Sequence, residues 1–179
     1  MANYWRKRNY QQAATTAEGL AKRGYVYLMS EFFTVPATGS VYFAMDTGGV
    51  EVEFKLYDIT SAQGEIHATL IEDPDAATTY SPITPRNLNR KYTDSSTVVL
   101  TSASAVSGGI AIASELIGNT SKAGGALASA KVHTLRDNTL YIMRFVNVSN
   151  QESTVHMNLG WSETDPGHYR IIDPVDPTD

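Results

Sequence analysis

The amino-acid sequence predicts an all-β protein, and three observations lead to this prediction. Apolar and polar residues alternate in several short runs, the pattern of strands that are buried on one face. Turn-forming residues separate these runs, as in a sandwich, a jelly roll or a barrel. Only residues 11–23 (QQAATTAEGLAKR) have a helical pattern, and Gly19 weakens it.

Three runs carry the clearest strand signal. Their apolar positions are Val41, Phe43 and Met45 in SVYFAMD; Val52, Phe54 and Leu56 in EVEFKLYD; and Val155, Met157, Leu159 and Trp161 in VHMNLGW. TLYIMRFVNV, residues 139–148, is less strictly alternating, as expected for an interior strand with partners on both sides. STVVLTS, IAIASELIG and ALASAKVHT are further strand candidates.

Other stretches are predicted to connect strands. Residues 141–161 predict a closing hairpin, with SNQES as its exposed turn. Residues 60–85 read as a long polar excursion with one apolar piece, IHATLI, and residues 117–125 (IGNTSKAGG) as a flexible loop with one cation, Lys122. Long loops at the ends of a sandwich often make binding surfaces, but a plain spacer remains an alternative for either stretch.

Composition excludes several classes of function. The 179 residues are enough for one domain, and the absence of cysteine removes disulfides, thiolate metal sites and a cysteine nucleophile. A net charge of -5 argues against nucleic acid as the main partner. No apolar run approaches the ~20 residues of a membrane span, and the first residues lack the apolar core of a signal peptide. We therefore expect a soluble protein that binds neither nucleic acid nor membrane.

Charge differs between the two ends of the sequence. Residues 1–24 are net basic, with Arg6, Lys7, Arg8, Lys22 and Arg23 against Glu18. The last stretch is net acidic, with Glu163, Asp165, Asp173, Asp176 and Asp179 against Arg170. These two ends could bind to neighbouring copies of the chain or to other surfaces of opposite charge. The alternative is that both ends are simply solvated. Tyr4, Trp5 and Tyr10 favour contact with a partner for the first segment, because large aromatics are enriched at interfaces.

No motif predicts catalysis. The histidines have no helical spacing or motif of a metal site; they are His67, His133, His156 and His168. The acidic run EDPDAATT lacks the glycine and distal glutamate of an EF-hand, and no GxSxG or P-loop sequence is present. We expect no enzyme, cofactor or metal. The enzymatic alternative is a sugar-cleaving sandwich in which Glu51 or Glu53 pairs with a second carboxylate across a cleft.

The order of segments resembles a family of small bacteriophage virion proteins, the jelly-roll-like head decoration or cement proteins. The resemblance covers roughly residues 31–163 and rests on these segments: FFTVPATGSVYFAMDTGG, VEVEFKLYD, RNLNRKYTDSSTVVLTS, ELIGNTSKAGGALAS and LRDNTLYIMRFVNVSNQESTVHMNLGWSE. In that family an NLNR element precedes a Ser/Thr/Val strand, a glycine-lysine loop follows, and a final hairpin that ends in Trp and an acidic residue closes the domain. Residues 60–85 and the DPVDPTD tail depart from the family pattern.

The resemblance implies an antiparallel β-sandwich of jelly-roll type over residues 31–163. Residues 1–30 would form an extended or partly helical arm, and residues 164–179 an acidic tail. The implied function is non-enzymatic: decorating and stabilising a phage capsid by bridging subunits of the major capsid protein, commonly as a homotrimer. The protein would be made in the bacterial host cytoplasm and would reside on the capsid surface. The alternative is a phage tail or receptor-binding module that recognises a glycan.

The residues we expect to contact the partner lie in the arm and in the glycine-lysine loop. They are Tyr4, Trp5, Arg6, Lys7, Arg8, Tyr10 and Lys122.

Overall fold

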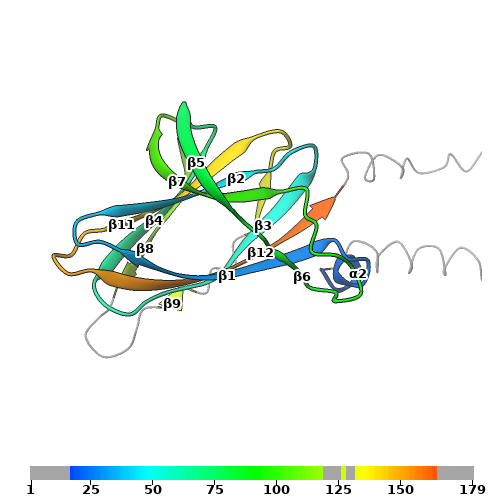
Figure 1. The fold of residues 1–179 in the computed structure, drawn as a ribbon, viewed down its shortest axis with the longest axis horizontal. Coiled ribbons are helices and arrows are strands. Elements are labelled where there is room, and N and C mark those ends of the chain that lie inside the picture. Colours follow the sequence, from blue (N-terminus) through cyan, green and yellow to red (C-terminus); the bar gives the residue numbers. More distant parts are fainter. Residues whose placement is uncertain (1–16, 119–125, 128–131, 165–179) are drawn as a thin grey trace, which may run out of the picture.

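The computed structural model describes residues 17–118, 126–127 and 132–164. These residues form two antiparallel sheets packed face to face, and one short helix, α2 (Ala17–Lys22), precedes them (Figure 1). The strands are β1 (Val26–Val35), β2 (Ser40–Asp46), β3 (Glu51–Ser61), β4 (Glu65–Glu72), β5 (Ala76–Ile83), β6 (Arg86–Asn87), β7 (Val99–Ser107), β8 (Ile110–Gly118), β9 (Ala126–Leu127), β10 (Val132–Leu135), β11 (Leu140–Asn147) and β12 (Ser153–Thr164). The predicted antiparallel β-sandwich is confirmed.

Strands adjacent in the chain mostly belong to different sheets. One sheet has the order β10-β3-β12-β1-β6, with β9 also against β3, and the other has the order β5-β7-β2-β11-β4-β8. Four of the pairs are nested: β1 with β12, β2 with β11, β3 with β10, and β4 with β8. The chain is therefore one long hairpin, β1 to β4 outward and β8 to β12 back, wrapped into two layers.

The last two strands are not a hairpin, so this prediction was wrong. β11 pairs with β2 and β4 in one sheet, whereas β12 pairs with β1 and β3 in the other. The connection between them is held by Asn147, whose side-chain amide donates to the carbonyls of Val35 and Gln151 (3.2 and 2.7 Å). Local alternation predicts a strand and its buried face, but it does not specify which strand becomes its neighbour.

Residues 60–85 are strands and not an excursion. β4 lies inside its sheet between β11 and β8, and Ile66, Ala68 and Leu70 are buried in the core. The polar side chains between them, such as His67, point out of the sandwich. The outward residues made this stretch look like a loop, although its alternation is that of a strand buried on one face.

Alternation places the main core correctly. Val52, Phe54, Val155, Met157 and Leu159 are fully buried between the sheets. Aromatic side chains also pack against one another in the core. The rings of Phe33, Phe43 and Phe145 meet edge to face with centres 4.9 to 6.0 Å apart. The ring of Trp161 stacks on that of Tyr27 at a distance of 6.0 Å.

A second, smaller core lies on the outer face of the β2–β11–β4 sheet. It consists of Ala44, Ile71 and Ile142, which alternate with residues of the main core and yet are buried. Beyond Ala103, β7 no longer pairs with β2, and Val106 packs against this cluster. The end of β7 thus covers the outer face of its own sheet, which explains why β11 is apolar on both faces.

Candidate interaction surface

The residues predicted to contact a partner, from Tyr4 to Tyr10 and at Lys122, lie outside the described residues. Among the residues that the structure describes, no three His, Asp or Glu side chains are grouped as a metal site would require. In the same residues no helix is long and apolar enough to cross a membrane.

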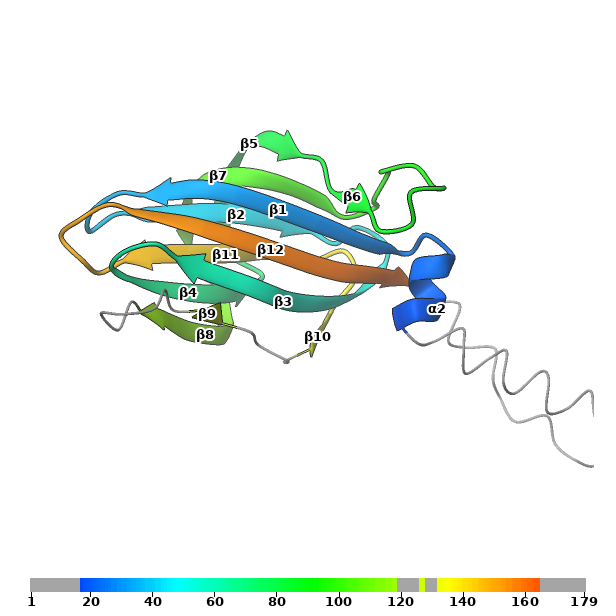
Figure 2. The same cartoon turned by 90° about the horizontal axis from the view of Figure 1, so that it is seen from below.

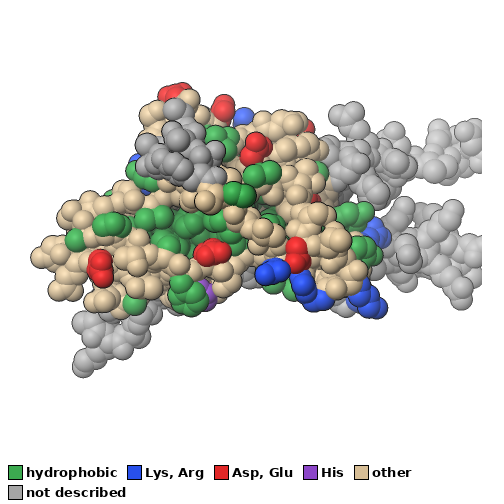
Figure 3. All heavy atoms as spheres, viewed as in Figure 1, with side chains coloured by type: hydrophobic (Ala, Val, Ile, Leu, Met, Phe, Trp, Pro, Cys, Tyr) green, Lys and Arg blue, Asp and Glu red, His purple; other side chains and the backbone are tan. Residues whose placement is uncertain are grey.

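One corner of the sandwich gathers most of the described cations. Lys22 ends helix α2 and Arg23 follows it, and Arg86, Arg90 and Lys91 belong to the adjoining loop, residues 86–95. Lys and Arg side chains cluster around α2 and β6 in the space-filling view (Figure 3), at the end of the sandwich where β1 begins and β12 finishes (Figure 2). We call the five residues together with this loop the basic corner.

Two asparagines fix the loop of the basic corner to the body. Asn87 donates from its side-chain amide to the carbonyl of Gly24 (2.8 Å), and Asn89 donates likewise to the carbonyl of Lys22 (2.9 Å). The side-chain oxygen of each accepts the backbone N–H two residues later (2.9 and 3.2 Å), the geometry of an Asx turn. The NLN sequence thus makes two consecutive turns. One turn is hydrogen-bonded to Lys22 at the end of α2, and the other to Gly24 just after it.

Asp94 organises the cations of this loop. Its carboxylate accepts the backbone N–H of Asn87 (2.8 Å) and the guanidinium groups of Arg90 (2.5 Å) and Arg86 (3.1 Å). The Asn87 N–H, followed by Arg90, lowers the pKa of Asp94 from 3.8 to about 2. The carboxylate therefore stays ionised at neutral pH and holds both arginines at the surface. In the part of the chain that is described, no carboxylate partner is found for Lys91.

Glu163 holds the other end of the loop from inside the body. Its carboxylate is buried and accepts hydrogen bonds from the indole N–H of Trp161 (3.0 Å), the backbone N–H of Thr97 (2.9 Å) and the hydroxyl of Ser96. Tyr27 adds a bond from its hydroxyl to the carbonyl of Ser95 (2.8 Å). Burial, then the nearby charge of Glu163, raises the pKa of Tyr27, which keeps it a neutral donor. These bonds join the loop to the core.

Apolar groups accompany the cations. Tyr25, Leu88 and Tyr92 are 43, 48 and 49% exposed and belong to the same corner. The ring of Tyr92 lies on Gly24, where a Cβ would be only 2.5 Å from the ring carbon Cγ. Interfaces are enriched in tyrosine and arginine, and truncation costs the most at such residues. The basic corner thus has the composition of a protein-binding surface on a rigid frame.

The same end of the sandwich also has an acidic side, the acidic corner, made by Asp46, Glu51 and Asp137. Here the buried hydroxyl of Thr47 donates to the carbonyl of Arg136 (2.7 Å) and accepts the N–H of Thr139 (3.0 Å). A shallow polar hollow of about 350 Å³ opens beside it, lined by Glu51, Thr134, Leu135, Arg136, Asp137 and Thr139. This hollow brings Glu51 together with Asp137, which sequence alone did not predict.

The buried side chain of Tyr141 supports the acidic corner from inside the sandwich. Its hydroxyl donates to Glu72 (2.9 Å) and accepts the backbone N–H of Arg136 (2.9 Å), while the Arg136 guanidinium lies 3.4 Å from Glu72. Burial raises the pKa of Tyr141 to about 12. Arg136 is therefore already paired, and the acidic corner presents its remaining carboxylates to solvent.

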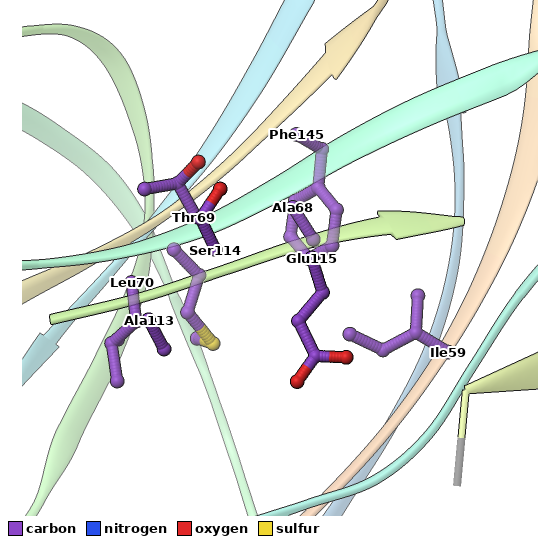
Figure 4. A pocket seen from close by; sticks show the side chains of 9 residues that line it. Ile59, Ala68, Thr69, Leu70, Ala113, Ser114, Glu115 and Phe145 are labelled. Carbon is purple, nitrogen blue, oxygen red and sulfur yellow. The ribbon is translucent and has the colours of Figure 1, made fainter. Parts of the chain in front are cut away.

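A second hollow opens at the side of the sandwich, between β3 and the strands β4, β8 and β11 (Figure 4). Its lining is largely apolar, from Ile59, Leu70 and Phe145, and Glu115 of β8 reaches into it. The enclosed space is about 20 Å³, which is room for about one water molecule. It is too small for a substrate or a glycan.

Sequence reasoning missed the basic corner as a site. NLNRKYTD entered only the family resemblance, although it holds two cations, Arg90 and Lys91, beside Leu88 and Tyr92. The alternating asparagines were the available signal, because Asn favours turns that present the intervening residues. No protein-family model matches the sequence, and a search of curated proteins gave no significant match.

Proposed function

We propose that the chain is a non-enzymatic phage virion protein that decorates and stabilises the capsid by bridging subunits of the major capsid protein. In this proposal it acts as a homotrimer on the capsid surface, and the basic corner contacts the shell. The observation that carries the proposal is that the NLNR segment, which resembles an element of the cement family, folds into an outward-facing basic and aromatic corner. An element with only a connecting role would not need to expose Tyr92 and Leu88 beside three cations.

The strand order supports the jelly-roll assignment. Four nested antiparallel pairs, β1·β12, β2·β11, β3·β10 and β4·β8, are what results when one long hairpin wraps into a double sheet. β5, β6 and β7 are then an addition between β4 and β8. This addition contains the loop of the basic corner, so in this proposal the double-sheet body carries its contact surface on an inserted segment.

Rigidity of the corner also supports an attachment role. Asn87, Asn89, Asp94 and Glu163 fix the loop by hydrogen bonds to backbone and side chains, so little conformational entropy is lost when it binds. Arms such as residues 1–16 would add further contacts, and several weak contacts in one oligomer add through effective concentration.

The experiment that tests the proposal is antibody labelling of intact particles of the source phage under the electron microscope. Label spread over the icosahedral shell is expected. Label confined to the tail, or found on no particle, would contradict the proposal. Deleting residues 1–10 should leave the body folded and weaken attachment, because the aromatic and basic residues of the arm are then gone; circular dichroism serves as the folding control.

A tail or receptor-binding module is the second candidate, and one observation favours it. Tyr25 and Tyr92 are exposed at one corner, and glycans are commonly bound on exposed aromatic rings beside side-chain amides such as Asn89. A glycan array with Tyr92→Ala as the matched control separates the two candidates. Glycan binding that is lost in this variant would support the second one.

A further inference from the structure

The basic corner lies beside the point where the described chain finishes. β12 runs from Ser153 to Thr164, its last residues pair with the start of β3 on one side, and Glu163 donates its backbone N–H to the carbonyl of Tyr25 on the other (2.9 Å). The end of β12 at Thr164 therefore lies between the acidic and the basic corner, beside α2 (Figure 2).

The two sides of this exit point differ in charge. On the β3 side lie Asp46, Glu51 and Asp137, with Arg136 already paired to Glu72. On the α2 side lie the five cations of the basic corner against Glu18 of α2, Asp94 and the buried Glu163, a net charge of +2 (five minus three). An acidic segment that starts here is repelled from one side and attracted to the other.

Residues 165–179 have the complementary charge. They contain Asp165, Asp173, Asp176 and Asp179 against Arg170, a net charge of −3 (four minus one) with histidine neutral. The last three aspartates recur every third residue, in DPVDPTD, with two prolines between them. In a polyproline II conformation, which has three residues per turn, this spacing puts the carboxylates on one face about 9 Å apart.

We propose that the acidic segment 165–179 docks on the basic corner of its own chain, with Lys91 as its principal unpaired contact. Attachment to the same body gives the segment a millimolar effective concentration at the corner. Its length is ample, because fifteen extended residues reach up to about 50 Å. In the proposed function the corner binds the capsid shell, so an acidic surface of the shell must then displace this segment. The docking of the segment does not itself depend on that function.

A zero-length carbodiimide cross-link tests the docking on the purified full chain. The reagent joins an amine to a carboxylate as an amide and takes up the released water as a urea, so only groups in contact are joined. Trypsin cleavage after Arg170 leaves the peptide 171–179, which carries three of the aspartates. We expect this peptide to be joined to Lys91 and Lys22, with a yield that falls about fivefold between low and high salt as screening increases.

Matched variants locate the contact. Lys91→Glu should reduce the Lys22 cross-link severalfold without unfolding the loop, because no described hydrogen bond uses the Lys91 ammonium. Arg136→Glu is the control, since Arg136 is a cation at the same end but beside the acidic corner, and its variant should leave the yield unchanged.

Three results would overturn the proposal. The first is that peptide 171–179 is cross-linked mainly to Lys7 of the basic first segment. The second is that it is cross-linked to neither lysine of the corner at low salt. The third is that cross-linked peptide pairs of mixed isotopic mass form when equal amounts of ¹⁴N and ¹⁵N protein are combined. Mixed mass would assign the segment to a second copy. No phage particle is used, so the result is independent of whether the protein decorates a capsid.

Discussion

The basic and the acidic corner lie at the same end of the sandwich, but different side-chain groups hold each of them to the backbone. In the basic corner, carboxylates face inward: Asp94 and Glu163 accept bonds from the backbone, and the cations remain outside. In the acidic corner, hydroxyls face inward: Thr47 and Tyr141 bond to the backbone around Arg136, and carboxylates remain outside. The inward groups fix the shape of each corner, and the outward groups set the charge that each corner presents to solvent.

The largest effect is expected when the inward carboxylate of the basic corner is removed. Glu163→Ala leaves the buried N–H groups of Trp161 and Thr97 without an acceptor, and we expect a loss of about 3 kcal/mol in the free energy of unfolding. Urea unfolding measures this loss. Glu163→Gln, which keeps the size and one acceptor oxygen, should lose roughly half as much. Unfolding free energy equal to that of the native chain would mean that Glu163 does not hold the corner.

The acidic corner should loosen independently of the basic one. Thr47→Val keeps the shape of the side chain but leaves the N–H of Thr139 unpaired, at a cost of about 2 kcal/mol. Hydrogen exchange should become faster at Thr139 and remain slow at Thr97, whose N–H is bound by Glu163. Equal acceleration at both amides would show that the two corners are one cooperative unit.

A glycine substitution should disturb the outward face of the basic corner. Gly24 has a φ of 81°, and the added Cβ of Gly24→Ala would displace the Tyr92 ring, so we expect a loss of about 1 to 2 kcal/mol and a change in the Tyr92 ring resonances. Gly49→Ala is the matched control, because nothing lies within 4 Å of its Cβ position. A Gly24→Ala protein with unchanged Tyr92 resonances would contradict the packing.

The smallest effect concerns pH. Because the pKa of Asp94 is lowered to about 2 in the folded protein, its contribution is complete above about pH 4, the ordinary value, and is lost as the pH falls toward 2. The amide resonance of Asn87 should therefore shift with a midpoint near pH 2, and Asp94→Asn should abolish this titration. A midpoint near pH 4 would show that the arginines and the Asn87 N–H are not bound to Asp94 in solution.

Local patterns predicted strands well and their neighbours poorly. The alternation of Val52 with Glu53 reports that one face is buried, and this holds whichever strand lies alongside. It does not report that β12 pairs with β1 and not with β11, because that pairing joins residues more than a hundred positions apart. The burial of Ala44 on an outer face was equally inaccessible, since it depends on how the end of β7 crosses the sheet.

The candidate surface was predictable only in part. The turns at Asn87 and Asn89 follow from local chemistry, because asparagine side chains bond to the backbone two residues on. The anchoring of the loop does not, since Asn87 reaches Gly24 and Glu163 reaches Thr97 across more than sixty residues. Sequence therefore shows which residues can form such a corner, and only the fold shows that they do.

In the proposed function the basic corner attaches the protein to the capsid shell, and rebinding to particles of the source phage that lack the protein tests this proposal most directly. Lys91→Glu combined with Tyr92→Ala should weaken binding about tenfold at low salt, because a charge and an aromatic contact are both removed. Arg136→Glu should bind like the native chain. Equal affinity of all three proteins would contradict the account and move the attachment surface elsewhere on the molecule.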